Sequence, residues 1–237
     1  MKKILIGFIV IGILTFVGCK KYQGNTNPTN TNSSSSGIQY GAGATDVDGN
    51  TYQSVIIGTQ EWMVENLRTK KYLDGTAIPN VASNTQGFPL STAAWSHFDN
   101  DNKYDTIYGK LYNWYAVETG KLCPAGWHVP TDAEWNVLTD YLGANGHSGT
   151  EGTALKATSG WNNNGNGTDD YGWLGLPGGC RNPNGSFYAI GRSGYCWSSS
   201  QTSAWDACYL HLGDNDDYVG RDSYDKRYGY SVRCFRD

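Results

Sequence analysis

The stretch Cys-Pro-Ala-Gly-Trp-His-Val-Pro-Thr-Asp-Ala-Glu-Trp, residues 123–135, runs directly into a well-marked helix start. Thr131, followed three residues later by Glu134, forms a capping box, in which each side chain satisfies a free main-chain N–H group. Apolar residues then recur at helical spacing over positions 135–142, and Gly143 stands where a C-cap glycine is expected. The stretch therefore predicts one amphipathic helix whose apolar face turns toward a core.

Outside this helix the chain consists mainly of short β-type segments separated by Gly and Asn turns. Runs of β-branched and aromatic residues predict strands, and these runs are residues 51–57, 61–64, 195–199, 208–212 and 230–236. A second, weaker helical segment covers Lys110 to Val117. We therefore expect an α+β fold in which one or two helices pack on short twisted antiparallel sheets with long irregular loops.

The first 37 residues do not have the composition of a folded domain. A basic start and an apolar run from Ile4 to Val17, too short to span a bilayer, indicate a signal peptide over residues 1–18. Gly18-Cys19 resembles a lipobox, so we expect Cys19 to be lipidated; the alternative is ordinary cleavage nearby, which leaves Cys19 as a free thiol. Residues 19–37 predict a flexible Asn/Thr/Ser linker, and residues 38–237 the domain.

These features predict an exported protein that a lipid anchor holds at the outer membrane, facing the periplasm or the cell surface. All 22 acidic residues lie at or after Asp46, whereas four of the 18 basic residues lie before it. The domain therefore has 14 basic residues (18 minus 4) against 22 acidic ones, a net charge of −8. Nucleic-acid binders are normally basic, so we exclude nucleic acid as a partner.

Several blocks of sequence together resemble a known family. They are residues 62–67 (WMVENL), 108–117 (YGKLYNWYAV), 123–130 (CPAGWHVP), 176–179 (LPGG), 197–200 (WSSS) and 231–237 (SVRCFRD). In these blocks the chain is similar, from about Thr45 to Asp237, to the Fibrobacter succinogenes major paralogous domain family. The resemblance implies a C-type-lectin-like fold, shared with the formylglycine-generating enzymes, and occurrence mainly in exported lipoproteins of Bacteroidetes and Fibrobacteres. No biochemical activity is established for the family as a whole.

The resemblance also implies a disulfide between Cys123, before the capped helix, and Cys234, in the last strand. Lectin-like folds commonly join a helix to the last strand by a disulfide of this kind. Cys180, Cys196 and Cys208 depart from the family pattern, in which aromatic residues are usual at these places. Disulfides are the default in an exported chain.

The spacing of these three cysteines leaves several pairings open. Cys196 and Cys208 are symmetric about Thr202 in a polar turn, so they are expected to face each other across a hairpin. Cys180 and Cys196 are symmetric about Tyr188, which is the alternative pairing. A third possibility is that these thiols are packed and unpaired.

The sequence contains none of the catalytic motifs that identify common classes of enzyme. It lacks a His-Glu-x-x-His zinc motif, a Gly-x-Ser-x-Gly elbow and a Gly-rich phosphate loop before a helix. The reactive cysteine pair of the formylglycine-generating enzymes is not found either. We therefore expect a protein without catalytic activity.

Ca²⁺ is the candidate ion, because hard oxygen ligands at alternate positions suit it. Asp46, Asp48 and Asn50 have this spacing around Gly49. The alternative is a plain hairpin turn. The Glu-Pro-Asn triplet of calcium-dependent lectins is absent.

Aromatic residues beside Asn and Asp are the chemistry of sugar-binding sites, because a sugar ring stacks on an aromatic face while polar groups fix its hydroxyls. The candidates are Trp161, Tyr171 and Trp173 around an Asn-rich loop, and Trp205, Asp206, Tyr218 and Arg221 in the C-terminal part. The alternative for each aromatic residue is a place in the core. The first hypothesis is therefore a surface binding or adhesion module, with polysaccharide as ligand. The second is a structural surface protein that binds a protein partner, and the third is an enzyme of unknown type.

Overall fold

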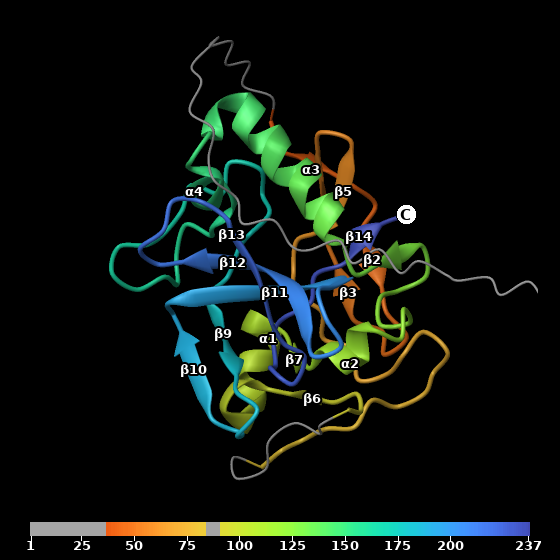
Figure 1. Cartoon of the computed structure of the whole chain (residues 1–237). Helices are drawn as coiled ribbons and strands as arrows, with labels where there is room; N and C mark the ends of the chain where they lie inside the picture. Colours follow the sequence, from red (N-terminus) through yellow and green to blue (C-terminus); the bar gives the residue numbers. More distant parts are fainter. Residues whose placement is uncertain (1–36, 84–90) are drawn as a thin grey trace, which may run out of the picture.

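The computed structural model describes residues 37–83 and 91–237 (Figure 1). The predicted signal peptide, the lipidation site Cys19 and nearly all of the predicted linker lie outside the described residues. Within the described part, the apolar and β-branched segments form several small antiparallel sheets, and few helices accompany them. The predicted α+β class is confirmed.

The first sheet has the strand order β1-β4-β5-β14-β8. Its strands are β1 (Gln39–Tyr40), β4 (Ser54–Ile57), β5 (Gln60–Met63), β8 (Trp127–His128) and β14 (Phe235–Arg236). The turn between Ile57 and Gln60 contains Gly58, whose φ of +63° favours glycine. The sheet therefore joins the start, the middle and the end of the described chain.

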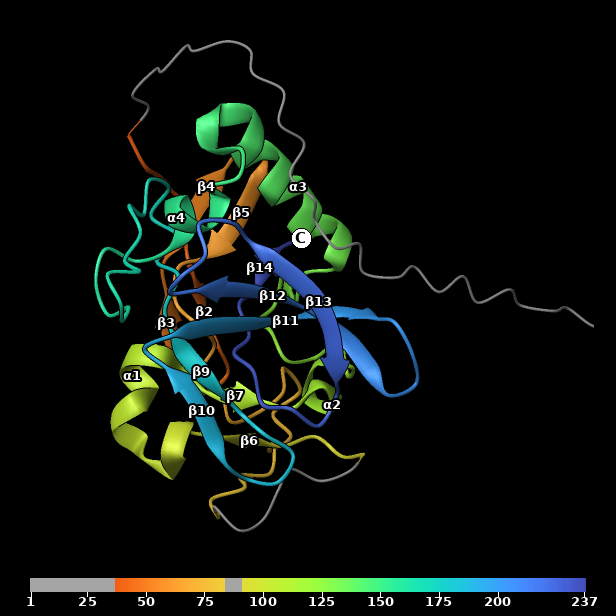
Figure 2. The same ribbon diagram turned by 60° about the vertical axis from the view of Figure 1, so that its left-hand side comes forward.

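The second sheet contains the three longest C-terminal strands in the order β11-β12-β13. These are β11 (Ser193–Gln201), β12 (Asp206–Gly213) and β13 (Gly220–Asp225). Figure 2 shows this sheet crossing the molecule between the longest helix on one side and the β9–β10 pair on the other. The remaining strands form two-stranded sheets: β2 (Ala44–Thr45) with β3 (Thr51–Tyr52), β6 (Trp95–Ser96) with β7 (Leu111–Tyr112), and β9 (Gly178–Arg181) with β10 (Phe187–Ile190).

The longest helix is α3 (Asp132–Leu142), and it begins as the sequence predicts. Thr131 accepts a hydrogen bond from the Glu134 N–H, and the Glu134 carboxylate accepts one from the Thr131 N–H at 2.7 Å. Gly143 follows the helix but keeps a right-handed backbone (φ −60°), so the chain continues into a π turn and reverses at Gly146 (φ +99°). The start of the helix is thus confirmed, and Gly143 lies at the C-cap as predicted, although its backbone is right-handed rather than left-handed.

The other helices are short. They are η1 (Phe98–Asn100), η2 (Asn102–Tyr104), α1 (Asp105–Tyr108), α2 (Trp114–Val117), η3 (Gly143–His147) and α4 (Glu151–Leu155). The helix predicted over Lys110–Val117 is wrong in its first half, because Leu111 and Tyr112 pair with β6 as strand β7. Similarly, only Phe235–Arg236 of the predicted strand 230–236 is regular, since Tyr230 and Ser231 make isolated bridges to other segments. No helix of the described residues is both long and apolar enough to cross a bilayer.

The two main sheets enclose two apolar cores. One core packs Met63, Tyr112, Trp114 and Trp197 with Val232. The other gathers residues from the first sheet, α3 and the Asn-rich loop, and includes Val55, Trp62, Trp135, Leu138 and Trp173. Trp62 and Trp135 stack there with ring centroids 4.4 Å apart. Helix α3 therefore lies where its apolar spacing predicts, on a core between the sheets.

A disulfide joins Cys123 to Cys234, with the Cα atoms 6.0 Å apart. It ties the segment before β8 and α3 to the residue that precedes β14. The pairing implied by the family resemblance is confirmed.

The expected Cys196–Cys208 bridge is wrong, because Cys196 is a buried free thiol. In the β11–β12 ladder Cys196 lies opposite Leu210, and Trp197 opposite Tyr209. The hairpin is therefore centred beyond Thr202, and the register is shifted by two residues from the symmetric arrangement. Cys180 is also a buried free thiol, so the alternative Cys180–Cys196 bridge is absent as well. Burial raises the pKa of both thiols to about 11.

Candidate functional site

Three of the candidate ligand-binding residues lie inside the protein. Trp161 is buried and its indole N–H donates to the Gly175 carbonyl at 3.0 Å. Trp173 is almost fully buried in the second core, and the guanidinium carbon of Arg233 lies 3.7 Å from its ring centroid. Arg221 is buried and donates to the main-chain carbonyl of Asp132 at 3.2 Å. The side chains of these three residues therefore fill the core and satisfy buried groups, and they do not form part of the exposed surface.

Tyr171 lies at the surface end of the same core. Its ring meets Tyr141 and His147 edge-on, at centroid distances of 6.2 and 5.5 Å. It lines a small cavity of about 130 Å³ together with Ile38 and Asp170. The neighbours of Tyr171 therefore come from the N-terminal strand and α3, and the other candidates are not among them.

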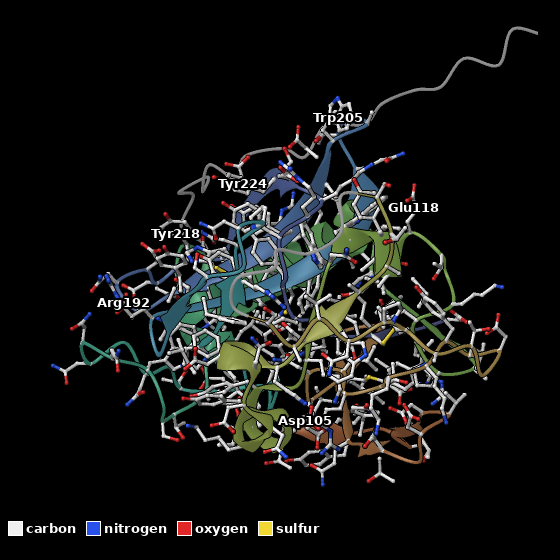
Figure 3. All side chains as sticks on the ribbon, turned by 90° about the horizontal axis from the view of Figure 1, so that it is seen from below. Asp105, Glu118, Arg192, Trp205, Tyr218 and Tyr224 are labelled. Atoms are coloured by element: carbon white, nitrogen blue, oxygen red, sulfur yellow. A yellow bond between two sulfur atoms is a disulfide. The ribbon has the colours of Figure 1, made fainter. Side chains whose placement is uncertain are left out.

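Trp205, Asp206 and Tyr218 are at the surface but do not form one site. Trp205 is 74 % exposed in the turn before β12, and Tyr218 is 47 % exposed in the turn after it. Eight residues of β12 separate the two turns, which is roughly 25 Å of strand. Figure 3 shows Trp205 at the tip of its hairpin and Tyr218 further along the same side of the molecule. The two side chains could contact only different parts of a long ligand.

The predicted calcium loop is held by the protein's own hydrogen bonds. The Asp46 carboxylate accepts from the N–H groups of Asp48 and Asn50, both at 2.9 Å, and from the Tyr52 hydroxyl at 2.6 Å. The Asp48 carboxylate accepts from the Lys70 N–H at 2.6 Å. Within residues 37–83 and 91–237, no group of three His, Cys, Asp or Glu side chains is arranged to hold a metal ion. The geometry is therefore that of a hydrogen-bonded hairpin turn.

The acidic turn after β12 is organised by a lysine. Lys156 is buried, and its Nζ donates to the carbonyls of Gly213 at 3.0 Å and Asp216 at 2.8 Å. Burial lowers the pKa of Lys156, and the nearby carboxylates of Asp214 and Asp217 act in the opposite direction. A protein ammonium group thus supplies the positive charge at the centre of this turn.

The face of the second sheet that packs on the first core carries, where it reaches the surface, a cluster that sequence reasoning missed. We call it the tyrosine patch, and its members are Tyr195 on β11, Tyr209 and His211 on β12, Tyr224 on β13, and Tyr228 after β13. Tyr224 is 47 % exposed, and the other members are partly buried. The signal that could have found it is alternation: Tyr195 precedes Trp197, and Tyr209 precedes His211, by two positions each. Residues two apart in a strand point to the same face.

The rings of the patch touch one another and rest on a buried ring, Tyr230. Tyr195 stacks on Tyr230 at 4.8 Å and on His211 at 4.8 Å on its other side. Tyr209 lies 5.2 Å from Tyr230, and Tyr224 meets Tyr228 edge-on at 4.7 Å. These distances are typical of favourable aromatic pairs. The patch is therefore a continuous, fixed aromatic surface.

The hydroxyl groups of Tyr195, Tyr209 and Tyr228 stay protonated at ordinary pH. Burial raises the pKa of Tyr209 and of Tyr228 to about 12. Burial also raises the pKa of Tyr195. A protonated phenol can donate as well as accept a hydrogen bond, so the patch offers both apolar ring surface and polar groups.

Trp205 extends this surface toward the tip of the β11–β12 hairpin. Tyr224 lies opposite Ala207 in the β12–β13 ladder, and Trp205 precedes Ala207 by two residues. The Trp205 carbonyl accepts from the Lys226 N–H at 2.9 Å, which fixes the turn against the end of β13. Figure 3 shows Tyr224 between Trp205 and Tyr218 along one side of the molecule.

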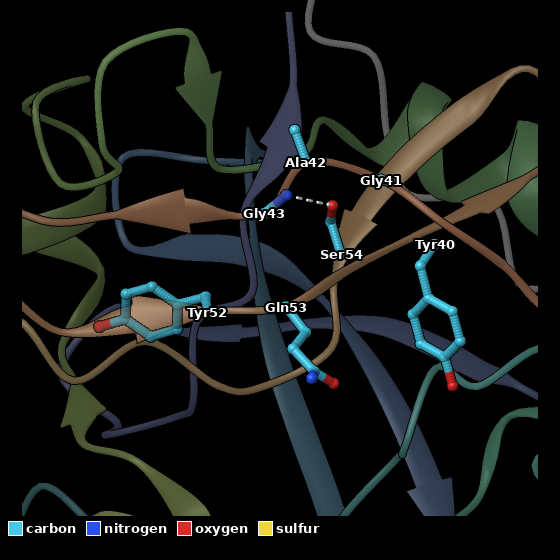
Figure 4. A pocket seen from close by; sticks show the side chains of 7 residues that line it. All are labelled: Tyr40, Gly41, Ala42, Gly43, Tyr52, Gln53 and Ser54. Atoms are coloured by element: carbon cyan, nitrogen blue, oxygen red, sulfur yellow. Dashed lines mark hydrogen bonds between the residues drawn. The ribbon is translucent and has the colours of Figure 1, made fainter.

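A second surface feature is a cavity of about 200 Å³ beside the N-terminal strand, lined by residues 40–43 and 52–54 (Figure 4). The side chains of Tyr40 and Gln53 project to the same side in this view. The Gly43 N–H donates to the Ser54 hydroxyl at 2.9 Å and holds the wall of the cavity in place. The cavity is small and has a single exposed ring, Tyr40.

Two clusters of titratable side chains lie elsewhere. His128 lies between Asp237, with Nδ1 to Oδ1 at 2.5 Å, and Glu134, with Nε2 to Oε1 at 3.0 Å. Asp105 contacts Lys110 Nζ at 2.5 Å and His97 Nδ1 at 3.4 Å. None of these residues lines either of the two cavities described above. The clusters therefore connect structural elements: β8, α3 and the C-terminal strand in one case, and the segment 97–110 in the other.

Comparison with known proteins gives one match. The family model described as Fibrobacter succinogenes major domain matches residues 55–236. No curated protein and no solved structure matches the chain. The match covers the second sheet, α3, the tyrosine patch and the first sheet apart from β1 and the first residue of β4.

Proposed function

Because the chain belongs to the Fibrobacter succinogenes major domain family, we propose that it is a non-catalytic binding module of the cell envelope whose ligand is a polysaccharide. The observation that carries this proposal is the tyrosine patch. It is a preformed aromatic surface on a rigid sheet, extended by the highly exposed Trp205.

The chemistry of the patch suits a sugar chain. Tyrosine and tryptophan supply a large rigid contact area at low cost in conformational entropy. The rings can lie against the apolar face of a pyranose, while the phenol groups hydrogen-bond its hydroxyls. Because the patch rings are already held by Tyr230, little ordering is required on binding. An extended ligand could run from the patch over Tyr224 to Trp205.

We further propose that binding does not need calcium. Lys156 provides the positive charge inside the acidic turn after β12, and the Asp46 carboxylate is occupied by protein donors. The calcium hypothesis for Asp46, Asp48 and Asn50 loses its support for the same reason. A chelator should therefore leave glycan binding unchanged.

The finer fold and the cellular location are part of the same proposal. A C-type-lectin-like arrangement is supported by the disulfide that ties the segment before α3 to the last strand. Export and lipid anchoring at Cys19 are supported by the sequence of residues 1–19. Metabolic labelling with a radioactive fatty acid tests the anchor: label is expected in the wild type and lost in Cys19→Ala. Label retained by the variant would contradict lipidation at Cys19.

The function is tested by retardation of the protein in native gels that contain a polysaccharide, over a panel of plant and host glycans. Wild-type protein is expected to be retarded equally with calcium and with chelator. Trp205→Ala and Tyr224→Ala should each weaken binding by about tenfold, which corresponds to ~1.4 kcal/mol. Both side chains are exposed, so these variants are expected to fold normally.

Tyr40→Ala is the matched control, because Tyr40 is 60 % exposed but lies beside the N-terminal cavity. It should bind like the wild type. Loss of binding in Tyr40→Ala with retention in Tyr224→Ala would move the site to that cavity. No retardation by any glycan would contradict the proposal and leave a protein partner as the better candidate.

A further inference from the structure

The tyrosine patch has an uncompensated negative charge at its edge. Asp222 is exposed on β13, directly opposite Tyr209 and two positions before Tyr224, so its side chain projects on the patch side of the sheet. Its Oδ1 atom accepts a hydrogen bond from the Ser223 N–H at 2.8 Å. Among the described residues, no cation lies within ion-pair distance of Asp222. The carboxylate therefore retains capacity to accept further hydrogen bonds.

The cations of this region are already engaged. Arg227 is paired with Asp225, with Nε 2.9 and 3.0 Å from the two carboxylate oxygens. The ammonium of Lys226 is held by the Gln201 amide oxygen at 2.5 Å and lies 4.3 Å above the Trp114 ring. These side chains cannot turn to an anionic ligand without breaking the contacts they make.

A third cation, Arg192, lies 3.4 Å from the Asp214 carboxylate beyond the far end of β12. At the near end, Asp206 lies opposite Asp225 in the β12–β13 ladder, next to Trp205. Asp206 and Asp225 alternate to the other face of the sheet, so Asp222 is the carboxylate on the aromatic face beside Tyr209, and the whole domain is acidic. The electrostatic character of the surface is complementary to a ligand without negative charge.

We infer that the ligand of the tyrosine patch is an uncharged polysaccharide, and that Asp222 accepts hydrogen bonds from a pair of its hydroxyl groups. This inference rests on the proposed function of the patch. A carboxylate can accept two donors side by side, and such charge-assisted bonds are stronger than neutral ones. The same carboxylate repels the carboxylate or sulfate groups of acidic polysaccharides, and the repulsion weakens as salt screens it.

The test compares uncharged and carboxymethylated forms of the same polymers, dextran and cellulose, in native gels at low and high ionic strength. The full-length protein, purified in detergent, is expected to bind the uncharged form at least about tenfold more tightly at low ionic strength. High ionic strength should narrow this difference. Equal retardation by both forms at low ionic strength would overturn the inference while leaving glycan binding intact.

Two charge-matched variants isolate the role of Asp222. Asp222→Asn should weaken binding of the uncharged polymer by roughly tenfold, because it replaces a charged acceptor with a neutral one, and should reduce the discrimination against the carboxymethylated form. Asp140→Asn removes the same charge from the exposed side of α3 and should change neither property. Identical behaviour of the two variants would overturn the inference. Failure of every polymer to retard the wild type would contradict the proposed function as well.

Discussion

The ammonium group of Lys156 donates a hydrogen bond to the main-chain carbonyl of Asp216 at 2.8 Å, across a separation of 60 residues. The same Nζ atom also donates to the Gly213 carbonyl. Lys156 lies at the C-cap of α4, so its side chain connects this helix to the turn between β12 and β13.

Replacing this lysine should destabilise the protein. Lys156→Met keeps much of the apolar stem but leaves two carbonyls without their donor, so the free energy of unfolding should fall by about 1–3 kcal/mol. Urea denaturation followed by tryptophan fluorescence measures the change. Lys103→Met, which removes an exposed lysine paired with Asp101, should leave the free energy of unfolding nearly unchanged. A loss in Lys103→Met as large as that in Lys156→Met would refute the assignment.

The Cys123–Cys234 bridge should contribute a large part of the stability, because it closes a loop of 111 residues in the unfolded chain. Replacing both cysteines with serine should lower the free energy of unfolding by about 2–5 kcal/mol. The fall is measured from the urea midpoint under non-reducing conditions. An unchanged midpoint in the double variant would show that the bridge is dispensable.

The capping box of α3 should contribute less to the free energy of unfolding than the disulfide does. Thr131→Ala removes the side-chain acceptor for the Glu134 N–H and should cost about 1 kcal/mol. Thr150 precedes α4 but makes no capping hydrogen bond through its side chain. Thr150→Ala should therefore be nearly neutral in the same denaturation experiment, and equal losses in the two variants would argue against a specific capping contribution.

The contacts of His128 predict a dependence of stability on pH. Burial alone lowers the pKa of this histidine, but hydrogen bonds to Asp237 and Glu134 outweigh it, and the pKa is raised above 6.5. A histidine with a raised pKa in the folded state binds its proton more tightly there than in the unfolded chain. Its stabilising contribution is present below pH 6.5 and is lost as the pH rises through the folded pKa.

The measurement is the melting temperature of wild type and His128→Gln between about pH 5 and 9. The difference between the two proteins should shrink as the pH rises. His211 has a lowered pKa because it is buried, so it acts with the opposite sign and is common to both proteins. The effect of His211 therefore cancels in the difference between the two melting temperatures. A difference that grows with pH would contradict the assigned direction.

Features that depend on neighbouring residues in the chain were predictable from the sequence. The capping box, the apolar spacing of α3 and the strands around the Gly58 turn all follow from local chemistry, and the structure has them. The second predicted helix failed because Leu111 and Tyr112 gain a strand partner, β6, which local propensity does not contain. Tertiary contacts of this kind override weak local preferences.

The register of the β11–β12 hairpin was not predictable from cysteine spacing. The turn places Gln201 opposite Ala207, and beyond the irregularity between Trp197 and Gln201 the pairing is still offset, so that Cys196 faces Leu210 and not Cys208. The binding candidates failed for a related reason, since an aromatic residue has the same appearance in a sequence whether it lies in a core or on a surface. Trp173 and Trp205 illustrate the two outcomes, with 1 % and 74 % exposure. The tyrosine patch lies on the consecutive strands β11, β12 and β13, but which rings become neighbours depends on the register of these strands.

The two-residue strand β1 has a mechanical consequence. A pull on the chain before Gly37 acts first on β1, which is an edge strand and pairs only through Gln39 with Ile56 and Tyr40 with Val55. Such a short pairing can be peeled away while the rest of the sheet, fastened behind it by the Cys123–Cys234 bridge, stays folded. Under such a pull, β1 would lengthen the chain by a few residues before any force reached the part of the domain that the bridge holds together.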